Sequence, residues 1–388
     1  MDNAISGVIS EREPIWAAGF MSGTSLDAVD AAMVLTDGHR VLDWGPVAER
    51  KYTGEERAVL QAAVDAARAW QWEGDAPEGA FSAARAVLTR THTDAFAALC
   101  AAPGAPVPLL AGVHGQTVLH RRPQFDGPGG GAVGATLQII DAVVLRTAFG
   151  VPLVYDFRSA DVAAGGEGAP LAPAYHGALL EGLGLEERGC GAVVLNLGGV
   201  ANITARTAEG GLVAFDTGPA NGPIDEWVLG HGHGTHDAGG RLAAAGTVHH
   251  DRLEALLGHA WFDQPPPKSL DRYDFGAGMV SGLSLEDGAA TLTAFTARAV
   301  AAGLAQLSDR PSKVVACGGG RHNPVLMAEL NAVCPCPVVA AEAVGWRGDS
   351  IEAEAFAFLA VRSVRGLPIS WPTTTGVPGA MSGGRVLA

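Results

Sequence analysis

A short polar turn at residues 22–25 has the composition of an anion-binding site, because it combines hydroxyl side chains with a glycine. The turn lies between two runs of small and apolar residues within 16–34, which predicts a strand, a turn and a returning strand. Hydroxyls and exposed backbone N–H groups are donors that phosphate accepts, and glycine adopts backbone angles that crowd other residues. An ordinary hairpin turn prefers the same residues, so the turn alone leaves both interpretations open. The candidate residues are Ser22, Gly23, Thr24 and Ser25, followed by Asp27 and Asp30.

A second strand, turn and strand of the same design follows at 192–205. If the two hairpins are related by a pseudo-twofold axis, both turns point into one cleft, where two sets of N–H donors can hold one polyphosphate. The residues at this second bend are Asn196, Gly198, Gly199 and Asn202.

Asp216 is the candidate for proton transfer. It follows a strand predicted at 211–215 and precedes the turn 217–219, so that its carboxylate is expected to project into a cleft. A carboxylate there also suits the N-terminus of a helix following Asn221, and the segment alone does not decide between the two roles.

Gly318, Gly319 and Gly320 separate a predicted buried strand at 313–317 from a helix predicted to begin near Asn323. Bare backbone at a helix N-terminus admits a phosphate or a flat ring, although it also permits close packing of the helix on the sheet. Because this junction lies at the matching end of the second sheet, the nucleotide interpretation is favoured.

Polar side chains also follow two strands predicted in the first half, near 107–113 and near 151–155. Burying so many polar groups is unfavourable without a ligand or mutual pairing. An ion pair between an arginine and an aspartate would explain two of them, whereas a pocket for a polar small molecule explains more. These residues are His114 and Gln116, then Asp156, Arg158, Asp161 and Glu167.

The elements that must position these residues repeat in order, and each half reads βββαβαβα. A polar stretch at 185–189 predicts the boundary, giving lobes at 1–187 and 188–388, with the C-terminal tail an optional addition to the first. The predicted strands are 16–21, 29–35, 41–47, 107–113, 151–155, 191–197, 200–206, 211–215, 313–317 and 337–340. The predicted helices are 55–70, 77–99, 134–148, 172–183, a segment from 221, 287–308, 323–332 and 350–365.

The composition predicts a globular α/β protein in two lobes: 388 residues, 48% hydrophobic and 17% charged, with a mean hydropathy of +0.18. A formal net charge of −15 argues against nucleic acid or an anionic membrane as the main partner. No apolar run reaches a membrane span, and the acidic start does not resemble a signal peptide, which predicts a cytoplasmic location.

The cysteines and a histidine-rich segment do not have the spacing of a zinc site or a disulfide framework. We expect the cysteines to be reduced, small core residues, and the histidines to lie in a surface loop. The cysteines are Cys100, Cys190, Cys317, Cys334 and Cys336, and the histidines are His231, His233 and His236.

Taken in order, these segments resemble the anhydro-N-acetylmuramic acid kinase family of the actin, hexokinase and Hsp70 superfamily. The resemblance spans nearly the whole chain and is more specific than any one glycine motif. The matching stretches are GFMSGTSLDAVD (19–30), GVHGQT (112–117), DFRSADVAAGGEGAPLAPAYH (156–176), LNLGGVANIT (195–204), FDTGPAN (215–221), PKSLDRYDF (267–275), ACGGGRHNPVLM (316–327), IEAEAFAFLAVR (351–362) and LPISWPTTTG (367–376).

The resemblance implies duplicated RNase H-like lobes of the actin/hexokinase type with a central cleft. It implies a kinase in peptidoglycan recycling that uses ATP and Mg²⁺ to phosphorylate O6 of 1,6-anhydro-N-acetylmuramic acid while water opens the anhydro bridge. Asp216 aligns with the family's catalytic aspartate and would accept the proton of that water. The partner would be this small amino sugar, with a homodimer left open.

The resemblance also assigns the binding residues. Phosphates would meet Gly23, Thr24, Ser25, Asp27 and Asp30 from one lobe and Gly198 and Gly199 from the other; adenosine would meet Gly318, Gly319, Gly320 and Asn323; and the sugar would meet His114, Gln116, Arg158 and Glu167. Arg158 either meets the lactyl carboxylate or stays in a structural pair. Departures from the family pattern are Ala28, Ile140, Glu167 and Glu354.

Three alternatives remain at this stage. Another sugar or small-acid kinase of the superfamily would share the ATP loops and differ over 112–176. A non-enzymatic actin-like nucleotide-binding protein would leave the polar cluster at 156–167 without a purpose. A glycosidase using Asp216 and a second carboxylate would work without ATP.

Overall fold

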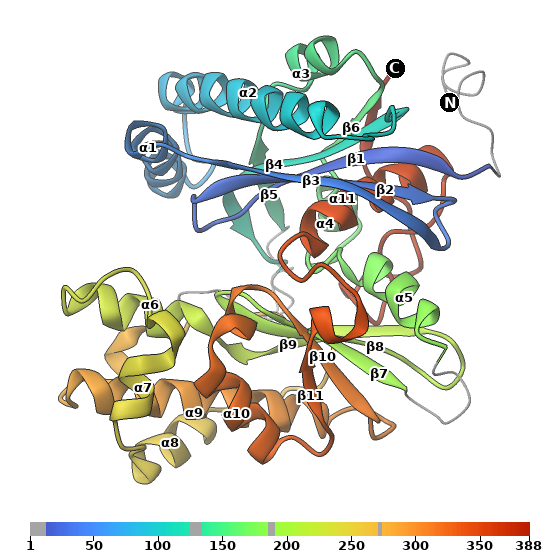
Figure 1. The fold of residues 1–388 in the computed structure, drawn as a ribbon. Coiled ribbons are helices and arrows are strands. Elements are labelled where there is room, and N and C mark those ends of the chain that lie inside the picture. The colour runs from blue at the N-terminus through green and yellow to red at the C-terminus, as the bar shows by residue number, and fades with distance from the viewer. Residues whose placement is uncertain (1–12, 124–133, 185–190, 271–273) are drawn as a thin grey trace, which may run out of the picture. The chain divides into compact units, whose positions relative to one another are not determined.

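The computed structural model describes residues 13–123, 134–184, 191–270 and 274–388 (Figure 1). The chain divides into two compact units, unit 1 with Met1–Gly182 and Glu352–Ala388, and unit 2 with Leu183–Ile351. The C-terminal segment therefore belongs to unit 1, the option that the sequence left open. The boundary predicted at 185–189 lies outside the described residues, as does Cys190.

Unit 1 contains a seven-stranded sheet in the order β12-β6-β4-β1-β2-β3, with β5 paired to β4. The central strands β1, β4 and β6 run parallel, and the hairpin strands β2 and β3 run antiparallel to their neighbours. The strands are β1 (Ile15–Ser22), β2 (Ala28–Thr36), β3 (Val41–Lys51), β4 (Leu110–Arg121), β5 (Ala135–Ile139), β6 (Leu153–Tyr155) and β12 (Arg385–Leu387).

Helices cover both faces of this sheet, with α1, α2 and α3 on one side and α11 on the other (Figure 1). The alternation of side chains along β1 explains the layering: Phe20 packs on Phe96 and Phe149, whereas Gly19 faces α11. The helices are α1 (Gly54–Trp70), α2 (Glu78–Ala101), α3 (Ala142–Phe149), α4 (Ser159–Ala163), α5 (Pro173–Gly182) and α11 (Ile351–Val364).

Unit 2 contains a five-stranded sheet in the order β11-β10-β7-β8-β9, where β7, β10 and β11 run parallel. Residues of α9 and α10 form one core with β7 and β8. The strands are β7 (Ala192–Leu197), β8 (Val200–Arg206), β9 (Leu212–Pro219), β10 (Lys313–Cys317) and β11 (Val338–Ala340). The helices are α6 (Asn221–Gly230), α7 (Arg241–Ala245), α8 (His250–Leu257), α9 (Leu285–Leu304) and α10 (Pro324–Val333), with 3-10 turns η1 (Ala238–Gly240), η2 (Ala277–Val280), η3 (Gly319–His322) and η4 (Ala341–Val344).

The two sheets share one connectivity. In unit 1 the order β6-β4-β1-β2-β3 follows the same path as β11-β10-β7-β8-β9 in unit 2. In each sheet three consecutive strands form an antiparallel meander, and the two remaining strands of this order are reached by helical crossovers and run parallel to the first strand. The predicted duplicated RNase H-like plan is confirmed.

Several local predictions are corrected. The helix predicted at 134–148 is wrong in its first part, where β5 precedes the shorter α3. The strand predicted at 211–215 continues to Pro219, because β9 pairs with β8 along its whole length. Cys100 is exposed rather than a core residue. The predicted surface position of His231, His233 and His236 is confirmed.

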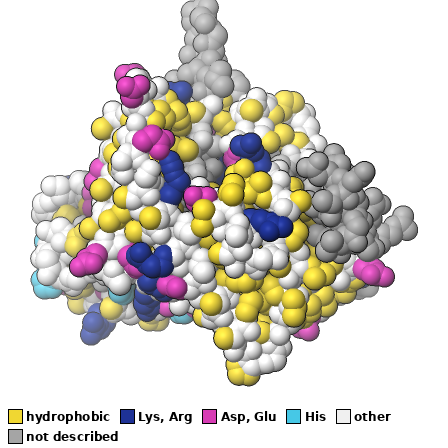
Figure 2. Space-filling view, turned by 90° about the horizontal axis from the view of Figure 1, so that it is seen from above, with side chains coloured by type: hydrophobic (Ala, Val, Ile, Leu, Met, Phe, Trp, Pro, Cys, Tyr) yellow, Lys and Arg dark blue, Asp and Glu magenta, His cyan; other side chains and the backbone are white. Residues whose placement is uncertain are grey.

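None of the described helices is both long and apolar enough to cross a membrane. On the face seen in Figure 2, basic and acidic side chains are dispersed among hydrophobic ones rather than segregated by sign.

Candidate active site

The first polar turn connects β1 to β2, and hydrogen bonds of the buried Ser22 side chain hold its first residue in place. The buried Ser22 hydroxyl lies 2.6 Å from Gln116 Oε1, to which it donates, and 2.8 Å from the hydroxyl of Tyr52. Gln116 Nε2 donates in turn to the carbonyl of Thr117 at 3.3 Å. Gln116, predicted on the sugar side, is thus buried beneath the turn with both ends of its amide bonded.

Beyond Ser22 the turn presents exposed polar groups. Thr24, Ser25 and Asp27 are exposed, and Asp27 Oδ1 accepts hydrogen bonds from the Ser25 hydroxyl at 2.8 Å and from the Ala28 N–H at 3.1 Å. Leu26 has a positive φ of 54°, and its N–H closes the turn onto the Gly23 carbonyl at 3.2 Å. The carboxylate of Asp27 is therefore oriented within the turn.

Asp30 lies farther from the turn than the other phosphate candidates. It is a half-buried residue within β2, where it pairs with Met21 on one side and Glu49 on the other.

The second turn, Gly198–Gly199, is held by the start of α6. Gly198 O accepts the Asn221 N–H at 3.0 Å, and Gly199 O accepts the N–H groups of Ala220 and Gly222 at 3.0 and 3.1 Å. A Cβ at Gly198 or Gly199 would meet no atom closer than 3.5 Å. Packing within the described protein does not require glycine at this turn, which leaves room for a ligand to approach the backbone.

Asp216 lies inside β9 rather than at a strand end, which corrects the prediction. It pairs with Asn202 of β8 and is 9% exposed. Its Oδ2 accepts the Leu270 N–H at 2.7 Å, and its own N–H donates to the Lys268 carbonyl at 2.9 Å. Asp216 does not cap α6, whose N-cap residue is Ala220.

The segment 261–270 that holds Asp216 was not singled out from the sequence for this role. Its Lys268 is buried, donates to the Phe262 carbonyl at 3.0 Å and lies 4.5 Å from the Trp261 ring. Burial lowers the pKa of Lys268. These contacts fix the segment, so that the Leu270 N–H orients the Asp216 carboxylate.

The glycine junction after β10 combines two roles. A Cβ at Gly318, whose φ is +75°, would lie 2.5 Å from Asn196 Oδ1, and a Cβ at Gly320 would lie 2.7 Å from Leu197 Cβ. These two glycines permit close packing on the end of β7. At Gly319, in contrast, an added Cβ would have no atom of the described residues within 4 Å, which leaves open space at the junction.

Asn323 begins α10 as predicted. Its Oδ1 accepts the N–H groups of Val325 and Leu326 at 3.0 and 3.1 Å, and Pro324 follows in the first turn. The side-chain oxygen of Asn323 is therefore engaged as a helix cap.

Two of the candidate sugar residues of unit 1, His114 and Arg158, are in direct contact. Arg158 Nε donates to His114 Nε2 at 2.9 Å, and its Nη1 donates to the Gly168 carbonyl at 2.7 Å. His114 Nδ1 lies 2.7 Å from the Gly115 carbonyl, so a neutral ring with the proton on Nδ1 satisfies both contacts. Burial and the neighbouring Arg158 hold the pKa of His114 well below its usual value.

Arg158 remains a cation at neutral pH although burial lowers its pKa to about 10. Glu352 and Asp161 act in the opposite direction as neighbouring negative charges. Among the described residues, Arg158 Nη2 has no hydrogen-bond partner. Two nitrogens of the guanidinium, Nε and Nη1, are therefore fixed by contacts within unit 1.

The loop that carries Gly168 and Glu167 is tied to the segment after α11. Buried Asp161 accepts the Gly168 N–H at 2.7 Å and the Thr375 hydroxyl at 2.6 Å, and the Glu167 N–H donates to the Thr375 carbonyl at 2.7 Å. Asp156, just before Arg158, adopts a positive φ of 52°, a strained conformation for a side chain that is typical of functional loops.

Another residue of unit 1, Glu354, departs from the family pattern and is buried in α11. It accepts a hydrogen bond from the Tyr175 hydroxyl at 2.5 Å. Its carboxylate is thus engaged within unit 1.

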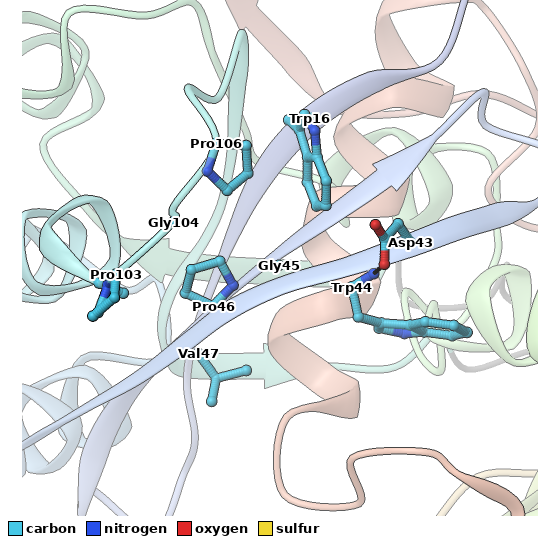
Figure 3. Close-up of a pocket in the computed structure, with 10 residues that line it drawn as sticks. Trp16, Asp43, Trp44, Gly45, Pro46, Val47, Pro103, Gly104 and Pro106 are labelled. Atoms are coloured by element: carbon cyan, nitrogen blue, oxygen red, sulfur yellow. Dashed lines mark hydrogen bonds between the residues drawn. The ribbon is translucent and has the colours of Figure 1, made fainter.

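A groove of about 510 Å³ on unit 1 contains none of the predicted site residues (Figure 3). Its one carboxylate, Asp43, accepts the Trp44 N–H at 2.8 Å, and the Trp44 indole donates to the Tyr175 hydroxyl at 3.2 Å. The groove is lined by Trp16, Asp43, Trp44, Gly45, Pro46, Val47, Ala102, Pro103, Gly104 and Pro106.

Comparison with known proteins adds a family match and curated relatives. The model of the family described as anhydro-N-acetylmuramic acid kinase matches residues 16–388. A protein of that name from Rhizobium rhizogenes is 50% identical over 377 residues, covering 96% of this chain and 99% of the relative. Another protein of that name, from Caulobacter vibrioides, is 52% identical over 372 residues, covering 95% of this chain and 98% of the relative.

Proposed function

The chain belongs to the anhydro-N-acetylmuramic acid kinase family, and from this premise we propose how its residues carry out the reaction. Relatives at about half identity carry this name over their whole length, so the chain is a kinase of this amino sugar. We propose that ATP is the phosphate donor and that water opens the 1,6-anhydro bridge during the transfer. The product would be N-acetylmuramic acid 6-phosphate, in peptidoglycan recycling within the cytoplasm.

The observation that best supports this reaction is the position of Asp216, which we assign as the general base. Its carboxylate is nearly buried and is oriented by the Leu270 N–H, as a base at a defined position requires. Asp216 accepts a proton from water as the water oxygen bonds to the anomeric carbon and the bond from that carbon to O6 breaks. O6 then bonds to the γ-phosphorus, and ADP leaves with the electron pair of the broken P–O bond.

The two turns are proposed as phosphate sites. The exposed residues Thr24 and Ser25 place polar groups at the surface of the first turn, which suits phosphate oxygens, and the open backbone at Gly198 and Gly199 allows close approach. The open space at Gly319 suits the adenosine.

Mg²⁺ fits this assignment as a partner of the nucleotide. The described residues contain no group of three or more His, Cys, Asp or Glu that could form a complete metal cage. Mg²⁺ commonly binds through one or two carboxylates together with substrate phosphates and water. Asp27, an exposed carboxylate within the first turn, is the proposed ligand, and the ion would neutralise charge on the phosphates.

Arg158 is proposed to bind the lactyl carboxylate of the sugar through its Nη2. The contacts from His114 and Gly168 preorganise the guanidinium, which lowers the entropy lost on binding. The half-buried Glu167 lies on the loop held by Asp161 and is a further candidate for the sugar side.

The experiment is turnover of 1,6-anhydro-N-acetylmuramic acid by the purified protein with ATP and Mg²⁺, with mass spectrometry of the product in ¹⁸O-labelled water. We expect one phosphate on O6 and one ¹⁸O at the anomeric carbon. Phosphorylation of glucose or N-acetylglucosamine but not of the anhydro sugar would contradict this assignment in favour of another sugar kinase. Ring opening without ATP would instead indicate a glycosidase.

A further inference from the structure

Arg321 lies in the η3 turn directly after the three glycines, and all of its donors are used. Nε donates to Glu342 Oε1 and Oε2 at 3.1 and 3.2 Å, and Nη2 donates to Glu342 Oε1 at 2.7 Å. Nη1 and Nη2 each donate to an oxygen of Asp349 at 2.7 Å. Nη1 also donates to the Gly318 carbonyl at 3.0 Å. One guanidinium thus binds two carboxylates in forked geometry and the glycine loop itself.

The two carboxylates come from a segment distant in sequence from the glycine loop. Glu342 lies in η4, and Asp349 lies just before α11. A Cβ at Gly348 would lie 2.3 Å from Arg321 Nε, so the guanidinium rests directly against the Gly348 backbone. The Gly348 N–H donates to Glu342 Oε1 at 3.2 Å, and the Gly318 N–H donates to the Gly348 carbonyl at 3.4 Å. Arg321 therefore joins the glycine loop to the segment 342–349. The cluster formed by Gly318, Arg321, Glu342, Gly348 and Asp349 is named here the arginine knot.

The charged side chains of the arginine knot differ in their exposure to solvent. The Arg321 side chain is 2% exposed, whereas those of Glu342 and Asp349 are 52% and 69% exposed. Burial alone would lower the pKa of Arg321, but its two carboxylates outweigh burial and raise it. Hydrogen bonds from Arg321 lower the pKa of Asp349 to about 2. A buried cation held on both sides keeps its partners in place, and its removal would leave two facing carboxylates that repel each other.

We propose that Arg321 is a positioning residue for the nucleotide: through the arginine knot it holds the Gly318–Gly320 backbone in the conformation that receives adenosine. This inference rests on the proposed function, which places adenosine at these glycines. Gly319 is open to a ligand, whereas Gly318 has both its N–H and its carbonyl bound within the knot. The side-chain donors of Arg321 are all engaged by Glu342, Asp349 and the Gly318 carbonyl, so its effect on the nucleotide is indirect.

A positioning role makes a kinetic prediction that a purely structural role does not. Arg321→Gln should raise KM for ATP about tenfold or more, because small displacements of positioned groups have effects of that order. The kcat at saturating ATP and the KM for the sugar should stay near those of the wild type, since Asp216 and Arg158 are untouched. Arg321→Lys keeps the charge but not the fork, and should recover only part of the ATP affinity.

Two variants test the knot from its other side. Glu342→Gln and Asp349→Asn each remove one charge while keeping a hydrogen-bond acceptor, and each should raise KM for ATP less than Arg321→Gln does. They also decide the matter should Arg321→Gln not fold. Arg298→Gln, an exposed arginine of α9 in the same unit, is the matched control and should leave both KM values unchanged.

The readouts are steady-state kinetics, thermal unfolding, and calorimetric binding of ADP with Mg²⁺ in the absence of sugar. The inference is overturned if folded variants of the knot bind ADP as the wild type does. It is also overturned if these variants show a lower kcat, a higher KM for both ATP and the sugar, and a lower unfolding temperature together, because that pattern indicates a general structural defect. If the wild type binds ADP but does not phosphorylate the sugar, the proposed function fails alone, and the ADP affinities still decide the role of Arg321. If the wild type does not bind ADP, both fail.

Discussion

Gly19 of β1 and Gly112 of β4 are register partners in the parallel sheet of unit 1, and the backbone of α11 lies against both. A Cβ at Gly19 would lie 2.0 Å from the Ala353 carbonyl oxygen, and one at Gly112 would lie 2.1 Å from that of Phe356. The helix therefore approaches the sheet at a distance that only two facing glycines permit. This contact places a helix from the end of the chain in the unit formed by its beginning.

Gly112→Ala should destabilise unit 1 by about 1–3 kcal/mol, because the added methyl group forces α11 away from the sheet. Urea denaturation measures the loss. Gly79→Ala in α2 is the matched control, since an added Cβ there meets no atom within 4 Å. We expect that control to be neutral or slightly stabilising, by up to about 1 kcal/mol. Equal denaturation midpoints for Gly112→Ala and the wild type would show that α11 does not pack this closely.

Asp216→Asn should lower kcat by about 10²–10⁴-fold, the usual contribution of a general base, while ADP binding stays nearly unchanged. The amide oxygen can still accept the Leu270 N–H, so the variant should fold as the wild type does. Stopped assays of phosphorylated sugar and calorimetry with ADP provide the two measurements. Asp251→Asn, at an exposed position of α8 in the same unit, controls for the change of charge. Wild-type turnover in Asp216→Asn would remove this residue from the mechanism.

Arg158→Gln should raise KM for the anhydro sugar by about tenfold or more, because a charge-assisted hydrogen bond to a carboxylate contributes about 1.5–3 kcal/mol. The KM for ATP should change little. A second substrate sharpens the test: 1,6-anhydro-N-acetylglucosamine lacks the lactyl carboxylate, so the variant should discriminate less between the two sugars than the wild type does. Arg85→Gln, on the surface of α2, serves as the control. If the variant discriminates between the sugars as before, Arg158 has only its structural contacts with His114 and Gly168.

The sequence predicted most elements of both sheets because each strand and long helix has a local hydrophobic period. It failed at 134–148, where apolar spacing also suits a helix but β5 is formed by pairing with β4, as between Ile139 and Gln116. Such pairing depends on a partner distant in sequence, which local periodicity does not report. The placement of α11 in unit 1 depends in the same way on Gly19 and Gly112, two glycines about 90 residues apart.

The candidate site divides similarly. Asp216, the two turns and Arg158 were proposed as site residues from the types and order of residues, whereas the contacts that hold them in the structure were not predicted. Leu270 orients Asp216 through a backbone N–H, which any residue type except proline provides, so no side-chain pattern could have revealed it. Gln116 was assigned to the sugar from its motif, yet the structure buries it under Ser22, because motif position does not specify the direction of a side chain.

His92 makes the stability of unit 1 depend on pH. It is fully buried in α2; Nδ1 lies 2.8 Å from the Leu88 carbonyl, and Nε2 has no hydrogen-bond partner in the part of the chain that the structure describes. Burial lowers its pKa from 6.5 to about 4. Between these two pH values His92 binds a proton in the unfolded chain but not in the folded chain. With respect to His92, the free energy of unfolding is therefore at its full value above pH 6.5 and falls as the pH drops toward 4. The loss from His92 is on the order of 3 kcal/mol over this range.

His92→Leu should remove this share of the pH dependence, because leucine cannot take up the proton. At pH 7.5 the variant should be as stable as the wild type or more so, since the unpaired Nε2 is gone. Urea denaturation at pH 7.5, 6.0 and 5.0 measures both effects. Hydrogen bonds from Arg50 lower the pKa of Glu56 from 4.5 to about 2, so the stability that Glu56 contributes is lost only below about pH 4.5, outside this range. His250→Leu, at an exposed position of α8, should keep the wild-type slope. Parallel slopes for His92→Leu and the wild type would mean that His92 has a similar pKa in the folded and unfolded chain, and would leave the pH dependence to the buried His114 and His176.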